Sequence, residues 1–427
     1  MESVGVGLLG LGTVGSAVAG RLIAEWELLG ERAGATPVLR CAAVRDVARR
    51  RELDLKNVRV VGDAQAVVAD PAVAVVVEVI GGTDPATGLI ETALRAGKSV
   101  VTANKAVIAA SGPLLAALAH EHGAGLYFEA AVGAGLPIVS LLERSLRGDR
   151  ISAIDCVING TTNVILTRLR SPGTSFDAAL ADAQRRGFAE MDPTLDVDGW
   201  DAAHKLVILA WLGFGAHIPT DTVDRLGIRR VHGDDVVVLS ELGYRVRLVA
   251  HAERAPNQAV HLRVRPTAVG PGHLLADVDD ADNAVIISSD LAGTVMLRGL
   301  GAGAASTASA VVGDVVEAVR EHGGPRAAPP VPGEATILSD EDVEVAGYVR
   351  LRLSGVGDGR ALVLQALEDR GLAVDAAVDL PGPQLAVLTG VAPRAVHDRA
   401  LETLDTLSSV DAIECALDRV ERRVETA

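Results

Sequence analysis

Acidic and amine-bearing side chains gather in one short stretch of the sequence. Between residues 187 and 205 the chain reads GFAEMDPTLDVDGWDAAHK. The carboxylates of Glu190 and Asp201 could hold a substrate ammonium, and the Lys205 amine could exchange a proton with a substrate hydroxyl. A helix that begins near Gly199 would place Asp201 and Lys205 one turn apart on one face. The stretch therefore indicates acid–base chemistry on a small substrate that carries an ammonium group.

Two other interpretations of this stretch stay open. Asp201 and Lys205 also fit an ordinary surface ion pair at helical spacing. Asp192, Asp196 and Asp198 could form a turn and capping cluster, or a loop that binds a divalent cation. Their spacing does not match an EF-hand, so we do not expect calcium.

A second lysine also invites a chemical role. Only four of the 40 basic residues are lysines, so a retained lysine favours amine chemistry, which arginine cannot perform. Lys105 follows a strand expected at residues 99–103, and open α/β sheets bind ligands outside the carboxyl ends of their strands. The alternative is a solvated lysine at the start of a helix.

Three glycines near the N-terminus have the spacing of a dinucleotide site. Gly10, Gly12 and Gly15 stand between an apolar strand and a segment with helical spacing. In that context they let the backbone approach a pyrophosphate at a helix N-terminus. The alternative is a tight turn without a ligand.

The end of the next expected strand, residues 37–45, bears on the choice of cofactor. Arg45 stands there, and Arg49, Arg50 and Arg51 follow. Arginines beside the adenosine ribose favour a 2′-phosphate, whereas Asp46 could hold a free 2′-hydroxyl. We expect NADP(H) to be preferred over NAD(H).

The elements around these residues predict an α/β protein. Alternating strands and helices over residues 1–130 indicate a Rossmann-like, doubly wound parallel sheet, to which a helix at 304–321 returns. Residues 131–303 have a mixed α+β pattern and would form the substrate-binding and dimerisation domain. Residues 322–334 are rich in proline and glycine, which predicts a linker over residues 322–345. Residues 346–427 show the βαββαβ order of a ferredoxin-like module.

Two loops could have a structural or a functional role. Asn159-Gly-Thr-Thr-Asn163 follows an expected strand and precedes a helix, so it could be a capped turn or a substrate loop. The glycines 299, 301 and 303 could approach the cofactor or form a flexible turn.

Composition excludes several classes of protein. The chain has 427 residues and a net charge of −16, which argues against a general nucleic-acid binder. No apolar run is long enough for a transmembrane helix. Three widely spaced cysteines form neither a disulfide framework nor a zinc pattern, so we expect a reducing, cytoplasmic setting.

Taken together, these motifs resemble the homoserine dehydrogenase family. The resemblance covers about residues 1–320, and the tail resembles an ACT regulatory domain. It rests on six segments: GLGTVG (10–15), VTANKA (101–106), EAAVGAGLP (129–137), NGTTN (159–163), GFAEMDPTLDVDGWDAAHK (187–205) and GLGAGAASTASAVVGDVV (299–316).

The resemblance implies NAD(P)-dependent interconversion of L-homoserine and L-aspartate 4-semialdehyde, on the route to threonine and methionine. It implies that Lys205 carries the proton of the substrate oxygen and that Lys105 lies close to the nicotinamide. Gly187, Glu190 and Asp201 would bind substrate. The family contacts its dinucleotide at the positions of Thr13, Val14, Arg45 and Gly301.

The resemblance also implies a structural monovalent cation, usually sodium, bound by backbone carbonyls at Glu129, Val132, Ala134 and Leu136. It suggests a homodimer or homotetramer, with threonine as a candidate effector of the tail. Three sequence departures accompany it. Phe188 replaces a tyrosine common in the family, and Ala304-Ala-Ser-Thr307 replaces the usual Gly and Pro-Thr. Ala361 follows Asp358-Gly359-Arg360 where ACT domains often carry glycine.

Two alternatives to this enzyme are an NADP-dependent oxidoreductase acting on another small amino or hydroxy acid, and a non-catalytic NADP-binding chain with an ACT sensor. Glu190, Asp201, Lys105 and Lys205 together disfavour the sensor.

Overall fold

The computed structural model describes residues 2–323, 333, 335–339, 341, 343–355 and 357–421. The chain divides into two compact units, and it passes between them several times. The first unit comprises Met1–Ile151, His204–Thr222 and Ser288–Ala335, and the second comprises Ser152–Ala203, Val223–Ile287 and Thr336–Ala427. Among the described residues, no helix has the length and apolar character needed to cross a membrane.

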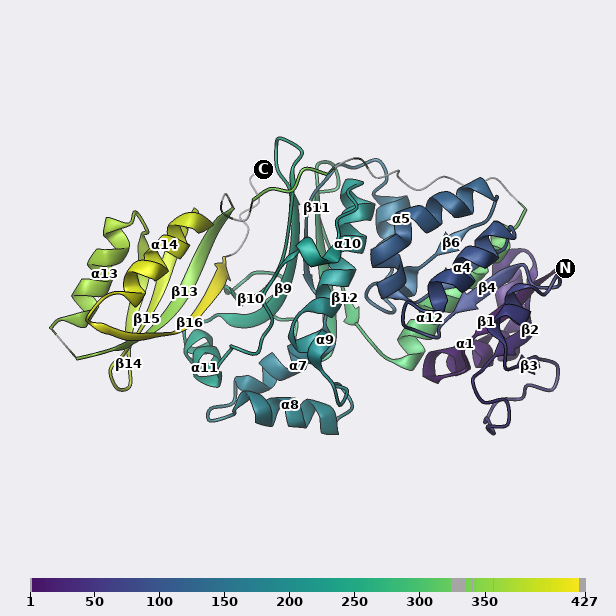
Figure 1. The fold of residues 1–427 in the computed structure, drawn as a ribbon, viewed down its shortest axis with the longest axis horizontal. Helices are drawn as coiled ribbons and strands as arrows, with labels where there is room; N and C mark the ends of the chain where they lie inside the picture. The colour runs from purple at the N-terminus through teal and green to yellow at the C-terminus, as the bar shows by residue number, and fades with distance from the viewer. Residues whose placement is uncertain are drawn as a thin grey trace. The chain divides into compact units, whose positions relative to one another are not determined.

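A parallel sheet forms the centre of the first unit (Figure 1). Its strand order is β3-β2-β1-β4-β5-β6, so the direction of winding reverses between β1 and β4. The predicted doubly wound sheet is confirmed. Its strands are β1 (Ser3–Leu9), β2 (Thr36–Ala43), β3 (Arg59–Val61), β4 (Val75–Glu78), β5 (Ser99–Thr102) and β6 (Leu126–Tyr127).

The register of this sheet brings the ends of four strands to one level. Ala43 of β2 pairs with Leu9 of β1, Leu9 pairs with Glu78 of β4, and Glu78 pairs with Thr102 of β5. Every loop that follows these residues therefore leaves from the same edge of the sheet.

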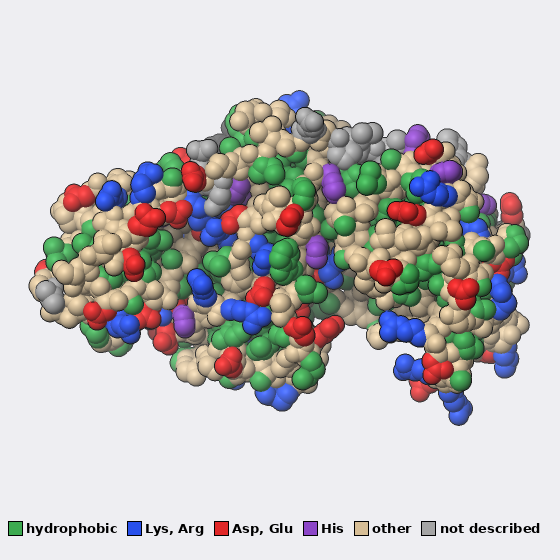
Figure 2. Space-filling view, viewed as in Figure 1, with side chains coloured by type: hydrophobic (Ala, Val, Ile, Leu, Met, Phe, Trp, Pro, Cys, Tyr) green, Lys and Arg blue, Asp and Glu red, His purple; other side chains and the backbone are tan. Residues whose placement is uncertain are grey.

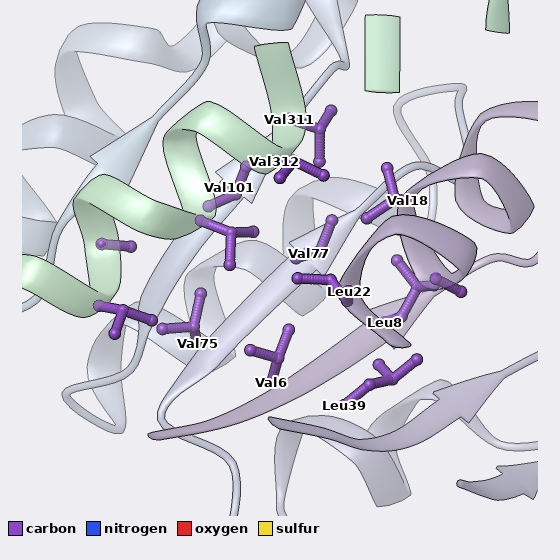
Figure 3. Packing of buried hydrophobic residues seen from close by; sticks show 14 of the residues in the cluster. Val6, Leu8, Val18, Leu22, Leu39, Val75, Val77, Val101, Val311 and Val312 are labelled. Carbon is purple, nitrogen blue, oxygen red and sulfur yellow. The ribbon is translucent and has the colours of Figure 1, made fainter. Parts of the chain in front are cut away.

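Helices cover both faces of the sheet because its strands are apolar on both sides. On one face, β1 and β4 residues pack against Val18 and Leu22 of α1 and against Val311 and Val312 of α12 (Figure 3). The helix expected to return to this domain thus contributes to its core. The helices of this unit are α1 (Thr13–Ala24), α2 (Trp26–Ala33), α3 (Ala64–Val68), α4 (Ala86–Arg95), α5 (Lys105–Glu121), α6 (Ile138–Ser140) and α12 (Ala304–Arg320), with the short turns η1 (Glu129–Ala131), η2 (Leu141–Ser145) and η3 (Thr220–Thr222) and strand β12 (Thr294–Leu300).

The second unit contains a mixed sheet whose strands follow one another in the order β11-β7-β9-β10-β16-β13-β15-β14. The sequence analysis did not identify β9 or α11. The elements outside the tail are β7 (Ile151–Val157), β8 (Asp224–Arg225), β9 (Arg245–Arg254), β10 (Val260–Val269), β11 (Asp282–Ser289), α7 (Gly160–Leu169), α8 (Phe176–Arg185), α9 (Thr194–Val197) and α11 (Gly233–Glu241). Helix α10 (Trp200–Phe214) has residues in both units.

The tail has the predicted βαββαβ order. It comprises β13 (Glu344–Leu353), α13 (Gly359–Asp369), β14 (Val374–Leu380), β15 (Gln384–Pro393), α14 (Arg394–Asp405) and β16 (Val410–Val420). Thr267–Val269 of β10 pair in parallel with Asp418–Val420 of β16, so the tail continues the sheet of the middle segment.

Much of the expected linker, 322–345, lies outside the described residues. Within its described part, the Val260 N–H donates to the Thr336 carbonyl and the Leu338 N–H donates to the Val260 carbonyl, both at 2.9 Å. This stretch therefore pairs with the start of β10.

A buried ion pair joins the tail to α11. Arg350 of β13 donates from Nε to Oδ1 of Asp235 at 2.7 Å, and the two residues are 4 % and 0 % exposed. The Tyr348 hydroxyl donates to the same carboxylate oxygen at 3.0 Å. Burial and the Asp235 carboxylate raise the pKa of Tyr348, so its hydroxyl remains a hydrogen-bond donor.

Replacing Asp235→Asn should lower the free energy of unfolding by about 3–5 kcal/mol, because Arg350 is left as a buried charge without its counter-ion. Urea unfolding of the full chain measures this change. Arg352→Met is the matched control, since Arg352 lies on the same strand in a half-exposed pair with Glu414. It should cost about 0–1 kcal/mol. Equal losses in the two variants would contradict the prediction.

Candidate functional site

The Gly10–Gly15 loop leaves the common edge of the first unit's sheet. The Gly10 N–H donates to the Ala43 carbonyl at 3.0 Å, which ties the ends of β1 and β2 together. A Cβ at position 15 would lie 2.0 Å from the Gly10 carbonyl oxygen, whereas a Cβ on Gly12 would meet nothing within 4 Å. Helix α1 begins at Thr13 without a side-chain cap. The loop therefore presents uncapped helix N–H groups beside open space, which suits a pyrophosphate.

The arginine-rich loop after β2 leaves the same edge. The Asp46 carboxylate accepts hydrogen bonds from the N–H groups of Ala48 at 2.9 Å and Arg49 at 3.2 Å. Arg51 donates to the Asp46 carbonyl at 2.9 Å. The Asp46 carboxylate is thus engaged by backbone N–H groups of its own loop, while the side chains of Arg45 and Arg49 are exposed.

Lys105 is placed by the residue before it. Asn104 caps α5 by accepting a hydrogen bond from the Val107 N–H at 3.4 Å. Its amide also donates to the Gly82 carbonyl at 2.6 Å, which joins the loops after β4 and β5. Lys105 is the first residue of α5 and is half-buried, so it lies at the edge from which the glycine loop also leaves.

Glu78 is a site-edge residue that the sequence analysis missed. Its side chain is fully buried and accepts hydrogen bonds from the Thr102 hydroxyl at 2.6 Å and the Ile80 N–H at 2.8 Å. It holds the ends of β4 and β5 in register. The sequence signal that could have identified Glu78 is a carboxylate at the end of an otherwise apolar strand.

In the second unit, one asparagine joins two carboxylates. The Asn159 amide donates to Asp196 at 2.7 Å and to Asp201 at 2.8 Å. The Thr161 hydroxyl lies 3.0 Å from the Asp196 carboxylate and 2.6 Å from the Phe188 carbonyl oxygen. The structure therefore brings the 159–163 loop to the acidic stretch, and it adds Asp196 to the acids already selected.

Asn159 is itself fixed by the end of β7 and the start of α7. Its Oδ1 accepts a hydrogen bond from the Thr162 N–H at 2.8 Å and so caps α7. This side chain is 4 % exposed, and its capping oxygen orients its amide nitrogen toward the acids. The capping interpretation of this loop is therefore confirmed, and its role in binding substrate stays a prediction.

Asp201 and Lys205 stand one turn apart on α10, as the spacing predicts. They are 7 % and 9 % exposed, so neither belongs to a solvated surface pair. Glu190 lies on an exposed loop, where Gln184 donates to its carbonyl at 3.0 Å. Gly187 begins this loop with a φ of 77°.

The remaining aspartates of the stretch serve the turn. Asp192 accepts a hydrogen bond from the Thr194 N–H at 3.1 Å, and the Thr194 hydroxyl together with this N–H lowers the pKa of Asp192. Asp198 pairs with Arg229 at 2.5 Å. The turn and capping interpretation therefore holds for Asp192, whereas the Asp198 side chain forms an ion pair.

The four residues expected to bind the cation, Glu129, Val132, Ala134 and Leu136, are buried. Two residues of this loop have a left-handed backbone. Ala134 has a φ of 52° and Gly133 a φ of 76°. The Glu129 carboxylate accepts hydrogen bonds from the N–H groups of Val139 at 2.7 Å and Ser140 at 2.8 Å, so it holds α6. Any ligands that this loop offers are therefore backbone carbonyls.

Helix α12 supports this loop from the other side. The Glu129 N–H donates to the Asp314 carboxylate at 2.9 Å. Burial, reinforced by the nearby charge of Glu129, raises the pKa of Asp314 well above its ordinary value. Gly301 precedes α12, which begins after Gly303 without a side-chain cap.

Comparison with known proteins decides the family. A family model described as "Homoserine dehydrogenase, NAD binding domain" matches residues 10–129, and one described as "Homoserine dehydrogenase" matches residues 137–316. The homoserine dehydrogenase of Corynebacterium glutamicum is 38 % identical over 99 % of this chain and 96 % of its own. The chain belongs to the homoserine dehydrogenase family.

Solved homoserine dehydrogenases have the same fold. The crystal structure from Thiobacillus denitrificans matches with a TM-score of 0.93 and 37 % identity over 99 % of both chains. A hyperthermophilic archaeal homoserine dehydrogenase in complex with NADPH matches with a TM-score of 0.63 and 32 % identity, over 76 % of this chain and 100 % of its own. The chain is thus an NAD(P)-dependent oxidoreductase that interconverts L-homoserine and L-aspartate 4-semialdehyde.

Replacing Asn159→Asp should lower kcat/KM for L-homoserine by about 10- to 100-fold. The new carboxylate keeps the cap of α7 but removes the donor to Asp201, and a hydrogen bond to a charged group is worth about 1.5–3 kcal/mol. Steady-state kinetics with saturating cofactor measures the loss.

The control for this prediction is Asn257→Asp, since Asn257 is exposed and also accepts a backbone hydrogen bond, at 3.0 Å from the Ala259 nitrogen. Cofactor affinity should be unchanged in both variants. Unchanged homoserine kinetics in Asn159→Asp would show that the amide does not position the acids.

Proposed function

We propose that Lys205 is the proton carrier of the homoserine dehydrogenase reaction. A nicotinamide held at the glycine loop would supply the hydride chemistry at C4 of the substrate. As homoserine is oxidised, the Lys205 amine takes the proton of the C4 hydroxyl, and in the reverse direction the ammonium returns it. The ammonium also stabilises negative charge that develops on the substrate oxygen. The observation that carries this assignment is a nearly buried lysine one turn from a buried, hydrogen-bonded aspartate.

Asp201 and Glu190 then bind the substrate ammonium, with Gly187 at the start of the same loop. Asn159 keeps the Asp201 carboxylate in place by donating to it, and it supports Asp196 in the same way. Neighbouring carboxylates favour a cation between them, so this cluster selects an amino acid over a simple hydroxy acid.

Replacing Lys205→Met should reduce kcat by about 100- to 10,000-fold, the range expected for loss of acid–base catalysis. NADPH binding, followed by fluorescence titration, should be unchanged because the glycine loop is untouched. Lys56→Met is the matched control, since the Lys56 side chain is 86 % exposed. Wild-type turnover in Lys205→Met would overturn the assignment.

Gly10, Gly12, Gly15, Thr13 and Val14 fit the cofactor's pyrophosphate. The supporting observation is the open space in front of Gly12 at the uncapped start of α1. Lys105, placed at the same sheet edge, is proposed to lie close to the nicotinamide, and Gly301 to contact the dinucleotide at the start of α12.

NADP(H) is proposed as the preferred cofactor. Asp46, the group suited to a free 2′-hydroxyl, is engaged by the N–H groups of its own loop. Arg45 and Arg49 are exposed beside it and suit a 2′-phosphate.

Replacing Arg45→Ala should raise KM for NADP by about tenfold and leave KM for NAD nearly unchanged, because only NADP carries the phosphate. Initial rates with the two cofactors measure this difference. The control is Arg40→Ala, an exposed arginine of β2 itself. Equal changes for both cofactors would contradict a 2′-phosphate contact.

Carbonyl oxygens at Glu129, Val132, Ala134 and Leu136 are proposed to bind a structural sodium ion. Peptide oxygens suit a hard cation, and the Glu129 carboxylate is already bonded to α6. Thermal melts in sodium chloride and tetramethylammonium chloride test this assignment.

Two further proposals concern assembly and regulation. The chain is proposed to form a homodimer or homotetramer, which sedimentation measures. The tail is proposed to act as an ACT domain with threonine as its candidate effector, which titration of activity with threonine tests. The Ala361 N–H already donates to Asp358 at 3.1 Å, so this turn is capped by its own chain.

A further inference from the structure

A second cluster of chemically competent side chains lies on the sheet of the second unit. His251 and Glu253 are on β9, and His261 is on β10 in register with Glu253. Residues two apart on a strand share a face, so all three side chains belong to one face of the sheet. Their ligand atoms, one from each residue, lie within 4.8 Å of one another.

The two histidines of this cluster are removed from solvent. His251 is 6 % exposed and His261 is 2 % exposed. The Glu253 side chain is 35 % exposed, and it therefore connects the cluster with solvent. This combination of buried imidazoles and a partly open carboxylate gives an ion both a water-poor site and a route to it.

The orientation of His251 is already set by an outer partner. Its Nδ1 lies 2.6 Å from the Asp155 carboxylate, on β7, and its Nε2 lies 3.5 Å from the Glu253 carboxylate. When Nδ1 carries the proton and donates it to Asp155, Nε2 presents its lone pair toward Glu253. Carboxylate–histidine pairs of this kind orient the imidazole ligands of metal ions.

The charges around the cluster favour a cation. Asp155 and Glu253 both face it, and the positive group in register with His251 is Arg263. Arg263 pairs with Asp418 at 3.6 Å, so an acid of β16 balances its charge.

We propose that His251, Glu253 and His261 form a binding site for a divalent ion of the zinc class. Two imidazoles and one carboxylate are a donor set that Zn²⁺ accepts with tetrahedral geometry. In such a site neighbouring ligand atoms are about 3.4 Å apart, so small side-chain movements would close the cluster around the ion, with water as a fourth ligand. The role is structural, because the ion would tie β9 to β10 and, through Asp155, to β7.

This site is distinct from the hydride-transfer machinery and from the proposed sodium loop. Through Asp155 the site also contacts β7, the strand that Asn159 follows. An ion here would therefore stabilise the strand that positions Asn159 and the two carboxylates it contacts.

Titration of chelator-treated full-length protein with zinc chloride, followed by calorimetry, tests the proposal. The wild-type chain should bind one zinc ion tightly, and its melting temperature should rise with zinc. Glu253→Gln and His261→Gln should each weaken binding by at least tenfold. Asp155→Asn should weaken it by about 10- to 100-fold, the effect expected for an outer partner of a metal-bound histidine.

Matched controls separate this site from adventitious surface binding. Glu241→Gln and His122→Gln alter exposed residues outside the cluster and should bind zinc like the wild type. Homoserine oxidation by the metal-free Glu253→Gln variant should remain at the wild-type level, which shows that it is folded. No stoichiometric zinc on the wild-type chain, or equal affinity in the wild-type and cluster variants, would overturn the proposal.

Discussion

Two neighbouring carboxylates that share one hydrogen-bond donor are the constraint around which the second unit is arranged. Asp196 and Asp201 repel each other, so they need a shared donor, and the Asn159 amide is that donor. This requirement sets the position of the loop after β7, because the same side chain must cap α7 with its oxygen. The same amide holds the Asp201 side chain in the first turn of α10, and Lys205 stands one turn later on this helix. A single side-chain amide therefore joins the end of β7, the cap of α7 and the first turn of α10.

The first unit meets a different requirement, which is to bring several loops to one edge. The register of the sheet achieves this, because four strand ends pair in one row: Ala43, Leu9, Glu78 and Thr102. Glycine at position 15 then allows the loop to fold tightly against α1. On the surface, acidic and basic side chains are interspersed over the face that Figure 2 shows, in keeping with a small-molecule enzyme.

Much of this architecture could be predicted because it depends on local signals. Apolar strands, the three glycines and the βαββαβ tail leave patterns within a few residues of themselves. The Asp201–Lys205 spacing could also be predicted, since a helix converts sequence distance directly into geometry. Glu78, Asn159 and the β10–β16 pairing were harder, because each acts through partners more than twenty residues away. The His251 cluster was missed for the same reason: β9 and β10 must pair before its side chains meet.

The helix that completes the core of the first unit has a consequence for biosynthesis. Val311 and Val312 of α12 cover the same sheet face as Val18 and Leu22, yet the last strand of that sheet ends at Tyr127. During translation, about 190 further residues must therefore be synthesised before α12 can cover this face of the sheet. At ordinary elongation rates this synthesis takes roughly 10–40 s. For that interval an apolar surface of the nascent chain is uncovered. A chaperone that shields such surfaces would find its substrate in the incomplete sheet, long before the protein has any enzymatic activity to protect.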